Sequence, residues 1–246
     1  MNEKQQLTRL VLLRHGQSIW NRDRHFTGWS NVALSPAGEE EAKVAGQLLK
    51  QSGFTFDACL TSELRRAQDT LALALSTMDQ QNLPVYRSWR LNERHYGALE
   101  GMQRWAAIRR FGLWSIVSCQ IRFNASPPSL GLDDLRAPVN QPCYASIDRS
   151  QLPLGESMQR TLERVLPLWQ DRIVPEMRAG KRLLIVSHKN LLKTLVMQLE
   201  GLTALQVMRL SIATGQPLCY ELDASLRPVR RYYLSALNDG ARKAAV

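Results

Sequence analysis

The chain has 246 residues and a formal net charge of +10, with 44% hydrophobic and 22% charged residues. This size and composition suit one globular α/β domain, or a core that carries one substantial insertion, and such a core needs no disulfide staple. No apolar run approaches the roughly 18 residues that span a bilayer, and residues 1–8 lack a signal-peptide core. We therefore predict a cytoplasmic protein that does not contact a membrane.

The first predicted elements surround a histidine. Leu10–Leu13 is wholly apolar, as expected of a strand buried on both faces, and it leads directly into Arg14-His15-Gly16. Ser35 and Pro36 then favour the start of a helix, as its N-cap and its first-turn residue. Gly53 is suited to end that helix.

Strands and helices continue to alternate along the chain. Residues 56–60 favour a strand, and helical spacing of apolar residues follows from Leu64 to Met78 and again from Met158 to Ile173. Leu183–Val186 is the clearest buried strand, and another apolar helix follows it. This alternation predicts an α/β fold of three layers, in which a mostly parallel sheet carries helices on both faces.

The alternation breaks down between about residues 113 and 153. Prolines gather there, at positions 127, 128, 138, 142 and 153. We interpret this stretch as an irregular insertion that serves as a lid, within a single domain that covers residues 1–246.

Two of the four histidines, His15 and His188, follow the two most apolar strands. Ligands of an open parallel sheet bind outside the carboxyl ends of its strands, so both histidines should face one site. A single histidine at a strand end is usually structural, whereas two of them, one preceded by Arg14, indicate function.

The excess of basic residues has two explanations. Nucleic acid attracts basic surfaces, but here Lys and Arg are scattered along the chain and no aromatic RNA-binding motif accompanies them. Several arginines that converge on one pocket for a small, highly anionic substrate explain the same excess. Charge alone does not choose between them.

Four motifs carry a resemblance to a known family. They are Arg14-His15-Gly16-Gln17-Ser18 with Trp20-Asn21, Phe26-Thr27-Gly28-Trp29, Asn92-Glu93-Arg94-His95-Tyr96-Gly97 and Ser187-His188-Lys189-Asn190. Together they resemble the histidine phosphatase superfamily, and in particular the phosphoglycerate mutases that depend on 2,3-bisphosphoglycerate. The similarity runs from about residue 7 to about residue 233 and is weakest inside the insertion.

The resemblance implies an isomerase of glycolysis and gluconeogenesis that interconverts 2- and 3-phosphoglycerate through a phosphohistidine. His15 would be the nucleophile, primed by 2,3-bisphosphoglycerate, with its other ring nitrogen held protonated by a backbone carbonyl near Gly16. Arg14, Arg66 and His188 would clamp the phosphoryl group as cations, so that no metal is required. Glu93 would be the general acid and base, rather than a surface carboxylate paired with a neighbouring arginine.

The resemblance also implies substrate contacts farther from the nucleophile. Arg104 stands where the family usually has lysine, which keeps the charge and changes its geometry. The contacts implied are Ser18, Asn21, Thr27, Gly28, Tyr96, Arg104 and Asn190.

Two departures from the family concern the far end of the substrate. The family has adjacent arginines where this chain has Gln120 and Ile121, so only the neighbouring Arg122 is cationic. Losing two guanidinium groups should weaken the binding of a second anionic group. Lys189 stands where the family has glycine, and it either turns outward or contacts the substrate and partly replaces the missing charge.

Alternatives to a mutase remain. A phosphatase would use the same phosphoenzyme and pass its phosphoryl group to water, and a pseudoenzyme would only bind anionic metabolites or a protein partner. A nucleic-acid-binding module explains the charge and none of the motifs. We therefore expect a small anionic phosphorylated substrate as the partner, no nucleic acid, and a homodimer by analogy with the family.

Overall fold

A computed structural model describes residues 7–235 of the chain. Within this range six strands form one sheet in the order β3-β2-β4-β1-β5-β6. The strands are β1 Thr8–Arg14, β2 Ala58–Thr61, β3 Val85–Arg87, β4 Leu183–Ser187, β5 Pro217–Leu222 and β6 Pro228–Tyr233. The first four are mutually parallel, whereas β5 runs antiparallel to β1 and to β6. The predicted mostly parallel sheet is confirmed, with an antiparallel edge that was not predicted.

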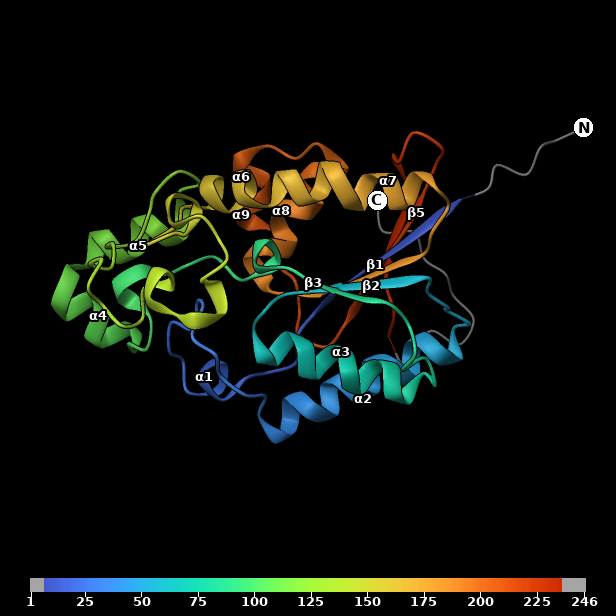
Figure 1. The fold of residues 1–246 in the computed structure, drawn as a ribbon, viewed down its shortest axis with the longest axis horizontal. Helices are drawn as coiled ribbons and strands as arrows, with labels where there is room; N and C mark the ends of the chain where they lie inside the picture. Colours follow the sequence, from blue (N-terminus) through green and yellow to red (C-terminus); the bar gives the residue numbers. More distant parts are fainter. Residues whose placement is uncertain (1–6, 236–246) are drawn as a thin grey trace, which may run out of the picture.

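Helices cover both faces of the sheet, as the apolar strands predict. In β1, Leu10 and Leu12 pack in the core beneath α6 (Met158–Leu168) and α8 (Lys189–Glu200). Val11 and Leu13 alternate with them and pack beneath α2 (Pro36–Gln51) and α3 (Arg65–Thr77). Figure 1 shows these two helical layers on opposite sides of the sheet, so the three-layer prediction is confirmed.

Local sequence signals account for where these helices begin and end. Ser35 caps α2, because its hydroxyl accepts the backbone N–H of Gly38 at 3.1 Å, and Pro36 begins the helix as predicted. Gly53 has a φ of +70° just beyond its end. The helix predicted from Met158 to Ile173 is regular only to Leu168, and a π turn over Trp169–Ile173 then leads into α7 (Val174–Arg178). Two further short helices are α1 Ile19–Arg22 and α9 Ala204–Arg209.

The stretch predicted as an irregular insertion begins with a helix. Leu113–Ile121 forms α5, because the turn-forming prolines of this stretch begin only at Pro127. The helix packs beside α4 (Arg104–Phe111). Between residues 122 and 157 the only regular elements are short 3₁₀ turns, and this segment contains neither an α-helix nor a strand. Figure 1 shows this whole region beyond the end toward which the parallel strands point.

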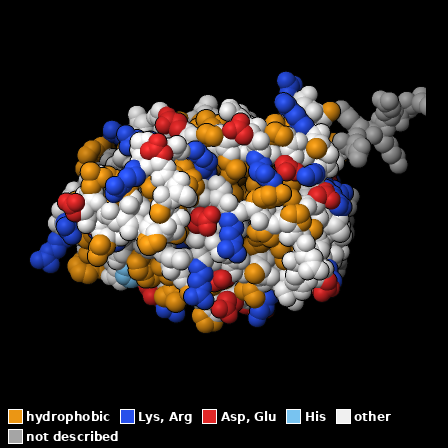
Figure 2. All heavy atoms as spheres, in the orientation of Figure 1, with side chains coloured by type: hydrophobic (Ala, Val, Ile, Leu, Met, Phe, Trp, Pro, Cys, Tyr) orange, Lys and Arg blue, Asp and Glu red, His pale blue; other side chains and the backbone are white. Residues whose placement is uncertain are grey.

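The surface of this region carries large hydrophobic side chains. Figure 2 shows hydrophobic surface in orange at this end, as elsewhere on the same face of the molecule. Trp105, Leu113, Trp114 and Ile121 are each more than half exposed.

Among residues 7–235, no helix combines the length and the apolar composition that crossing a bilayer requires.

Candidate active site

A cavity of about 780 Å³ lies at the carboxyl ends of β1 and β4, between the sheet and the α4–α5 pair. Most of the side chains singled out in the sequence line it. They are Arg14, His15, Asn21, Thr27, Gly28, Arg66, Glu93, Tyr96, Arg104, Lys189 and Asn190. The other two, Ser18 and His188, are fully buried and do not line it.

His15 follows the last residue of β1 and is fixed on both sides. Its backbone N–H donates to the carbonyl of Ser187 at 2.9 Å, which ties it to the end of β4. Its Nδ1 lies 2.7 Å from the carbonyl oxygen of Gly16. Since a carbonyl only accepts, Nδ1 carries the proton and Nε2 keeps its lone pair. Burial, with help from Arg66 and Arg14, lowers the pKa of His15 well below its ordinary value, so the ring is neutral.

Arg66, in the first turn of α3, reaches across to this lone pair. Its Nε lies 3.3 Å from Nε2 of His15, and its two terminal nitrogens donate to the carbonyls of Ser30 at 2.9 Å and Gly28 at 2.7 Å. Burial lowers the pKa of Arg66 to about 10, so the side chain remains a cation at neutral pH. A positive charge is thus held beside the candidate nucleophile by two main-chain carbonyls.

His188 lies behind His15, with ring centres 4.9 Å apart. Its Nε2 is 2.8 Å from the hydroxyl oxygen of Ser62, and its buried Nδ1 has no hydrogen-bond partner within residues 7–235. Burial, followed by the charge of Arg66, lowers the pKa of His188 well below its ordinary value. This argues against the positive charge that was predicted for His188 and leaves it a neutral hydrogen-bonding group.

Glu93 also lines the cavity and is 8% exposed. Its Oε1 accepts the backbone N–H of Arg94 at 2.8 Å and that of Asn190, near the start of α8, at 3.2 Å. The guanidinium of Arg94 donates instead to the carbonyls of Glu156 and Cys119. The alternative of a surface Glu–Arg pair therefore does not describe this carboxylate.

Ser18 supports the site without lining it. Its hydroxyl accepts the backbone N–H of Asn21 at 3.2 Å, and the Asn21 side chain accepts the N–H of Ser18 at the same distance. This reciprocal pair is a capping box that begins α1. Ser18 therefore orients Asn21, which does line the cavity.

The far end of the cavity is built from α4 and α5, whereas the start of α8 lies beside Glu93 and contributes Lys189. Lys189 lines it together with Gln120, whereas the guanidinium of Arg122 lies outside, 5.1 Å from the ring centre of Trp114. Of the two cations offered as substitutes for the missing arginine pair, only Lys189 is in place. Tyr96 accepts a hydrogen bond from the Asn190 side chain at 2.9 Å.

Several lining residues were not predicted as contacts. Phe26 belongs to one of the four motifs but was given no role, and Gln120 was noted only as a departure. The others lie between the motifs or in a helix with no local functional signal, and they are Asp23, Arg24, His25, Gln103, Trp105 and Ile108. Arg24 and His25 immediately precede Phe26-Thr27-Gly28-Trp29, and that adjacency was the one signal available.

A sequence profile of the histidine phosphatase superfamily (branch 1) matches residues 10–137 and 133–232. The chain belongs to the histidine phosphatase superfamily. Enzymes of this superfamily act on small phosphorylated substrates. The resemblance inferred from the Arg14-His15-Gly16 motif and its three companions is confirmed.

Curated relatives within the superfamily are similar over the whole chain. "2,3-bisphosphoglycerate-dependent phosphoglycerate mutase 1" of Nitrosomonas europaea is 72% identical over 234 residues, which cover 95% of this chain and 100% of that protein. "2,3-bisphosphoglycerate-dependent phosphoglycerate mutase" of Hamiltonella defensa is 44% identical over 239 residues, covering 97% and 96%.

Solved structures share the superfamily fold at lower identity. The α-ribazole phosphatase of Shigella flexneri superposes with a TM-score of 0.71 at 25% identity, over 92% of this chain and 96% of that one. A mycobacterial glucosyl-3-phosphoglycerate phosphatase superposes with a TM-score of 0.66 at 23% identity, over 87% of this chain and 92% of that one. These likenesses support the three-layer fold.

Proposed function

We propose that this protein is a 2,3-bisphosphoglycerate-dependent phosphoglycerate mutase, which interconverts 2- and 3-phosphoglycerate through a phosphohistidine at His15. The proposal rests on the 72% identity to the Nitrosomonas europaea mutase over 95% of the chain. The cavity is consistent with it, because Arg14, Arg66, Arg104 and Lys189 all line it and suit a substrate with several negative charges.

The residues of the cavity fit a bisphosphorylated molecule. Arg14 Nε and Thr27 Oγ1, from residues that line the cavity, are buried and have no partner in the described part of the chain, so each is suited to donate to a phosphate oxygen. His188 Nδ1, behind His15, also has no partner there. 2,3-Bisphosphoglycerate, when bound, supplies the phosphoryl group that first loads His15.

In the proposed first step, the Nε2 lone pair of His15 attacks phosphorus. The bond from phosphorus to the substrate oxygen breaks as the new N–P bond forms, and Glu93 donates a proton to the leaving oxygen. Arg66 stands 3.3 Å from Nε2 and neutralises charge on the transferring group. Because Nδ1 of His15 carries the ring proton and the ring is neutral, no proton has to leave Nε2 before attack.

In the second step, Glu93 takes the proton of the hydroxyl that attacks the phosphohistidine. We assign the Ser62 hydroxyl as the donor to Nε2 of His188, 2.8 Å away, so that Nδ1 of His188 carries the ring proton. Transfer between two hydroxyls of one molecule requires that water stays out. We assign that task to the predicted lid, residues 113–153, of which α5 contributes Gln120 to the cavity wall.

One set of assays tests the proposal. Purified protein is given 3-phosphoglycerate with and without 2,3-bisphosphoglycerate, and in parallel a panel of phosphate esters. We expect 2-phosphoglycerate to form, with a strong dependence on the bisphosphate. Release of inorganic phosphate that is faster than isomerisation would identify a phosphatase instead.

We further propose that the protein serves glycolysis and gluconeogenesis in the cytoplasm and that it forms a homodimer. Both follow from the similarity to the mutases and not from the geometry of the cavity. Sedimentation equilibrium of the purified protein tests the dimer, and a single species with the mass of one chain, 27.9 kDa, would contradict it.

A further inference from the structure

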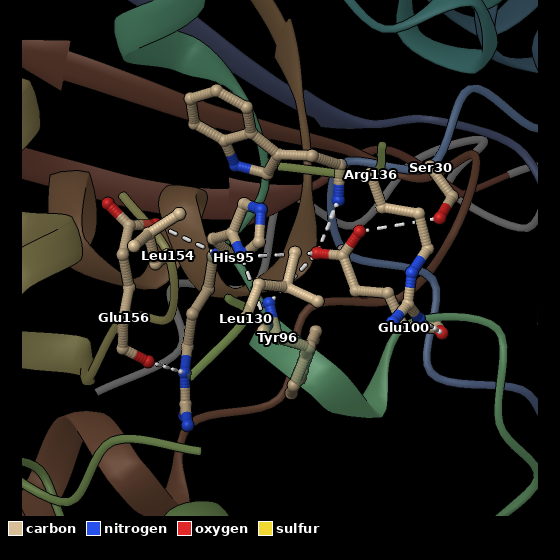
Figure 3. A network of polar contacts seen from close by, with 12 residues as sticks. Ser30, His95, Tyr96, Glu100, Leu130, Arg136, Leu154 and Glu156 are labelled. Carbon is tan, nitrogen blue, oxygen red and sulfur yellow. Dashed lines mark hydrogen bonds and ion pairs between the residues drawn. The ribbon is translucent and has the colours of Figure 1, made fainter. Parts of the chain in front are cut away.

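Glu100 is a buried carboxylate, 3% exposed, at the junction of two segments of the site. Its Oε1 accepts the backbone N–H groups of Trp29 and Tyr96, each at 3.0 Å. Its Oε2 accepts the hydroxyl of Ser30 at 3.3 Å. Figure 3 shows this network, in which the carboxylate lies between the side chain of Ser30 and the chain at Tyr96. Glu100 itself does not line the cavity.

Each partner of this carboxylate leads to a group in the cavity. The carbonyls on either side of Trp29 hold the guanidinium of Arg66, and the indole of Trp29 donates to the carbonyl of Glu93 at 2.5 Å. The hydroxyl of Tyr96 accepts from Asn190. The residues that hydrogen-bond to Glu100 therefore also help to hold Arg66, Glu93 and Asn190.

The backbone at Gly28 is shaped to admit this carboxylate. Gly28 has a φ of +51°, and a Cβ built there would lie 1.9 Å from Oε1 of Glu100. Only glycine at this position lets the carboxylate approach the 27–30 loop so closely. The conformation of the loop and the position of Glu100 thus depend on each other.

We propose that Glu100 is a positioning residue, which ties the 27–30 loop to Tyr96 and thereby holds Arg66 and Glu93 in place around His15. This role presupposes the proposed function, because it acts through groups assigned to that chemistry. A salt bridge does not explain the carboxylate, since its polar contacts within 3.3 Å are two main-chain amides and a hydroxyl.

The charged and titratable groups that face Glu100 come from three segments. His95 Nδ1 lies 3.5 Å from Oε1 and accepts the N–H of Gly97, and burial lowers the pKa of His95 to about 3, so it is neutral. Arg66 acts from α3. Arg136, paired with Asp134, donates to the main-chain carbonyl of Glu100 at 2.9 Å.

The protonation state of Glu100 determines which substitution is conservative. Burial raises the pKa of Glu100 to about 7, against the hydrogen bonds from Trp29 and Tyr96. A protonated carboxyl still accepts both amides through one oxygen and donates through the other. Glutamine has the same arrangement, so it should preserve the network that alanine removes.

The test compares Glu100→Ala, Glu100→Gln and a matched control, Glu200→Ala. Glu200 is the last residue of α8 and accepts hydrogen bonds from Tyr220 and Arg231. Two quantities are measured below the melting temperature of every variant: kcat/KM for 3-phosphoglycerate, and the affinity for vanadate, a phosphoryl mimic, by calorimetry. For Glu100→Ala we expect both to fall about tenfold or more, because two buried amides lose their acceptor.

Rescue by the conservative variant separates positioning from general destabilisation. Glu100→Gln should keep kcat/KM within about threefold of wild type, and Glu200→Ala should lower the melting temperature while kcat/KM stays unchanged. Wild-type kcat/KM in Glu100→Ala, or an equal loss in Glu100→Gln and Glu100→Ala, would overturn the proposal. Absence of mutase turnover in the wild type would instead refute the proposed function, and vanadate affinity would still decide the role of Glu100.

Discussion

The two ends of the cavity are built differently. At the reacting end, His15, Arg66 and Glu93 are at most 8% exposed, and each is held by a main-chain carbonyl or amide. At the far end, Arg104 is exposed on α4, and Trp105 beside it is 65% exposed. One end is buried and held by main-chain hydrogen bonds, and the other is exposed to solvent.

This difference suits the demands on the two ends. Charge that develops during phosphoryl transfer is stabilised best by groups that need not move, whereas the far end has only to recognise the rest of the substrate. Changes at the reacting end should therefore lower kcat. Changes at the far end should mainly raise KM.

The largest effect should come from His15→Ala, which removes the nucleophile at the reacting end. We expect no turnover and no acid-labile phosphate on the protein after brief labelling. His25→Ala, which changes another histidine of the cavity lining, should still form the phosphoenzyme. Label on the His15→Ala protein would place the nucleophile elsewhere.

Next in size should be Glu93→Gln, which keeps the shape of the side chain and removes its proton chemistry. We expect kcat to fall by about two to four orders of magnitude, the usual contribution of a placed acid or base, with substrate binding preserved. Glu63→Gln, outside the cavity lining, is the control. An unchanged kcat in Glu93→Gln would reduce Glu93 to a structural acceptor of the Asn190 amide.

Alanine substitutions at two glycines with positive φ separate the cost of backbone strain from disruption of the active site. Gly28→Ala places its Cβ against Glu100, and we expect kcat/KM to fall about tenfold or more. Gly53→Ala, at a φ of +70° with no atom within 4 Å of the new Cβ, should cost about 1 kcal/mol of unfolding free energy and leave kcat unchanged. Equal activities in the two variants would show that the 27–30 loop tolerates displacement.

Lys189→Gln and Arg122→Gln test which of the two cations proposed to replace the missing arginine pair binds substrate. Lys189 lines the cavity, so its replacement should raise KM by about tenfold, the worth of one charge-assisted hydrogen bond. Arg122 packs on Trp114, and its replacement should change KM less than about twofold. If Arg122→Gln has the larger effect, α5 must turn when substrate binds.

The smallest effect should be a pH-dependent one in Glu100→Gln. The folded protein has a pKa of about 7 at Glu100, above the ordinary value of 4.5. Between these values the folded state holds a proton that the unfolded state has released, so this group makes the wild type less stable as pH rises. The melting temperature of the variant minus that of wild type should therefore increase by a few degrees from about pH 5 to about pH 8. Parallel curves would contradict the raised pKa.

Local signals were sufficient for the layers of the fold and for the reacting end of the site. Leu10–Leu13 and Leu183–Val186 are apolar throughout, so each predicted a buried strand, and parallel neighbours bring the residues that follow them to one edge. His15 and His188 are adjacent in space for that reason. The sequence missed β3, a short exposed edge strand, and the antiparallel strands β5 and β6. β5 is almost wholly buried, but Pro217 and Glu221 interrupt its apolar run, and β6 is only partly buried and carries two arginines.

Two features could not be predicted without the tertiary structure: which cation lines the cavity, and the contacts of Glu100 with the segments that hold the reacting end. Arg122 and Lys189 look equally suitable in the sequence, but Arg122 follows the last residue of α5 in an extended conformation, and its guanidinium packs on Trp114 outside the cavity lining. Glu100 gains two of its three partners, Trp29 and Ser30, from a loop about 70 residues earlier. Neighbours along the chain determine whether a segment is a strand or a helix and where it ends. Which side chains meet across a cavity is decided only when segments distant in sequence pack together.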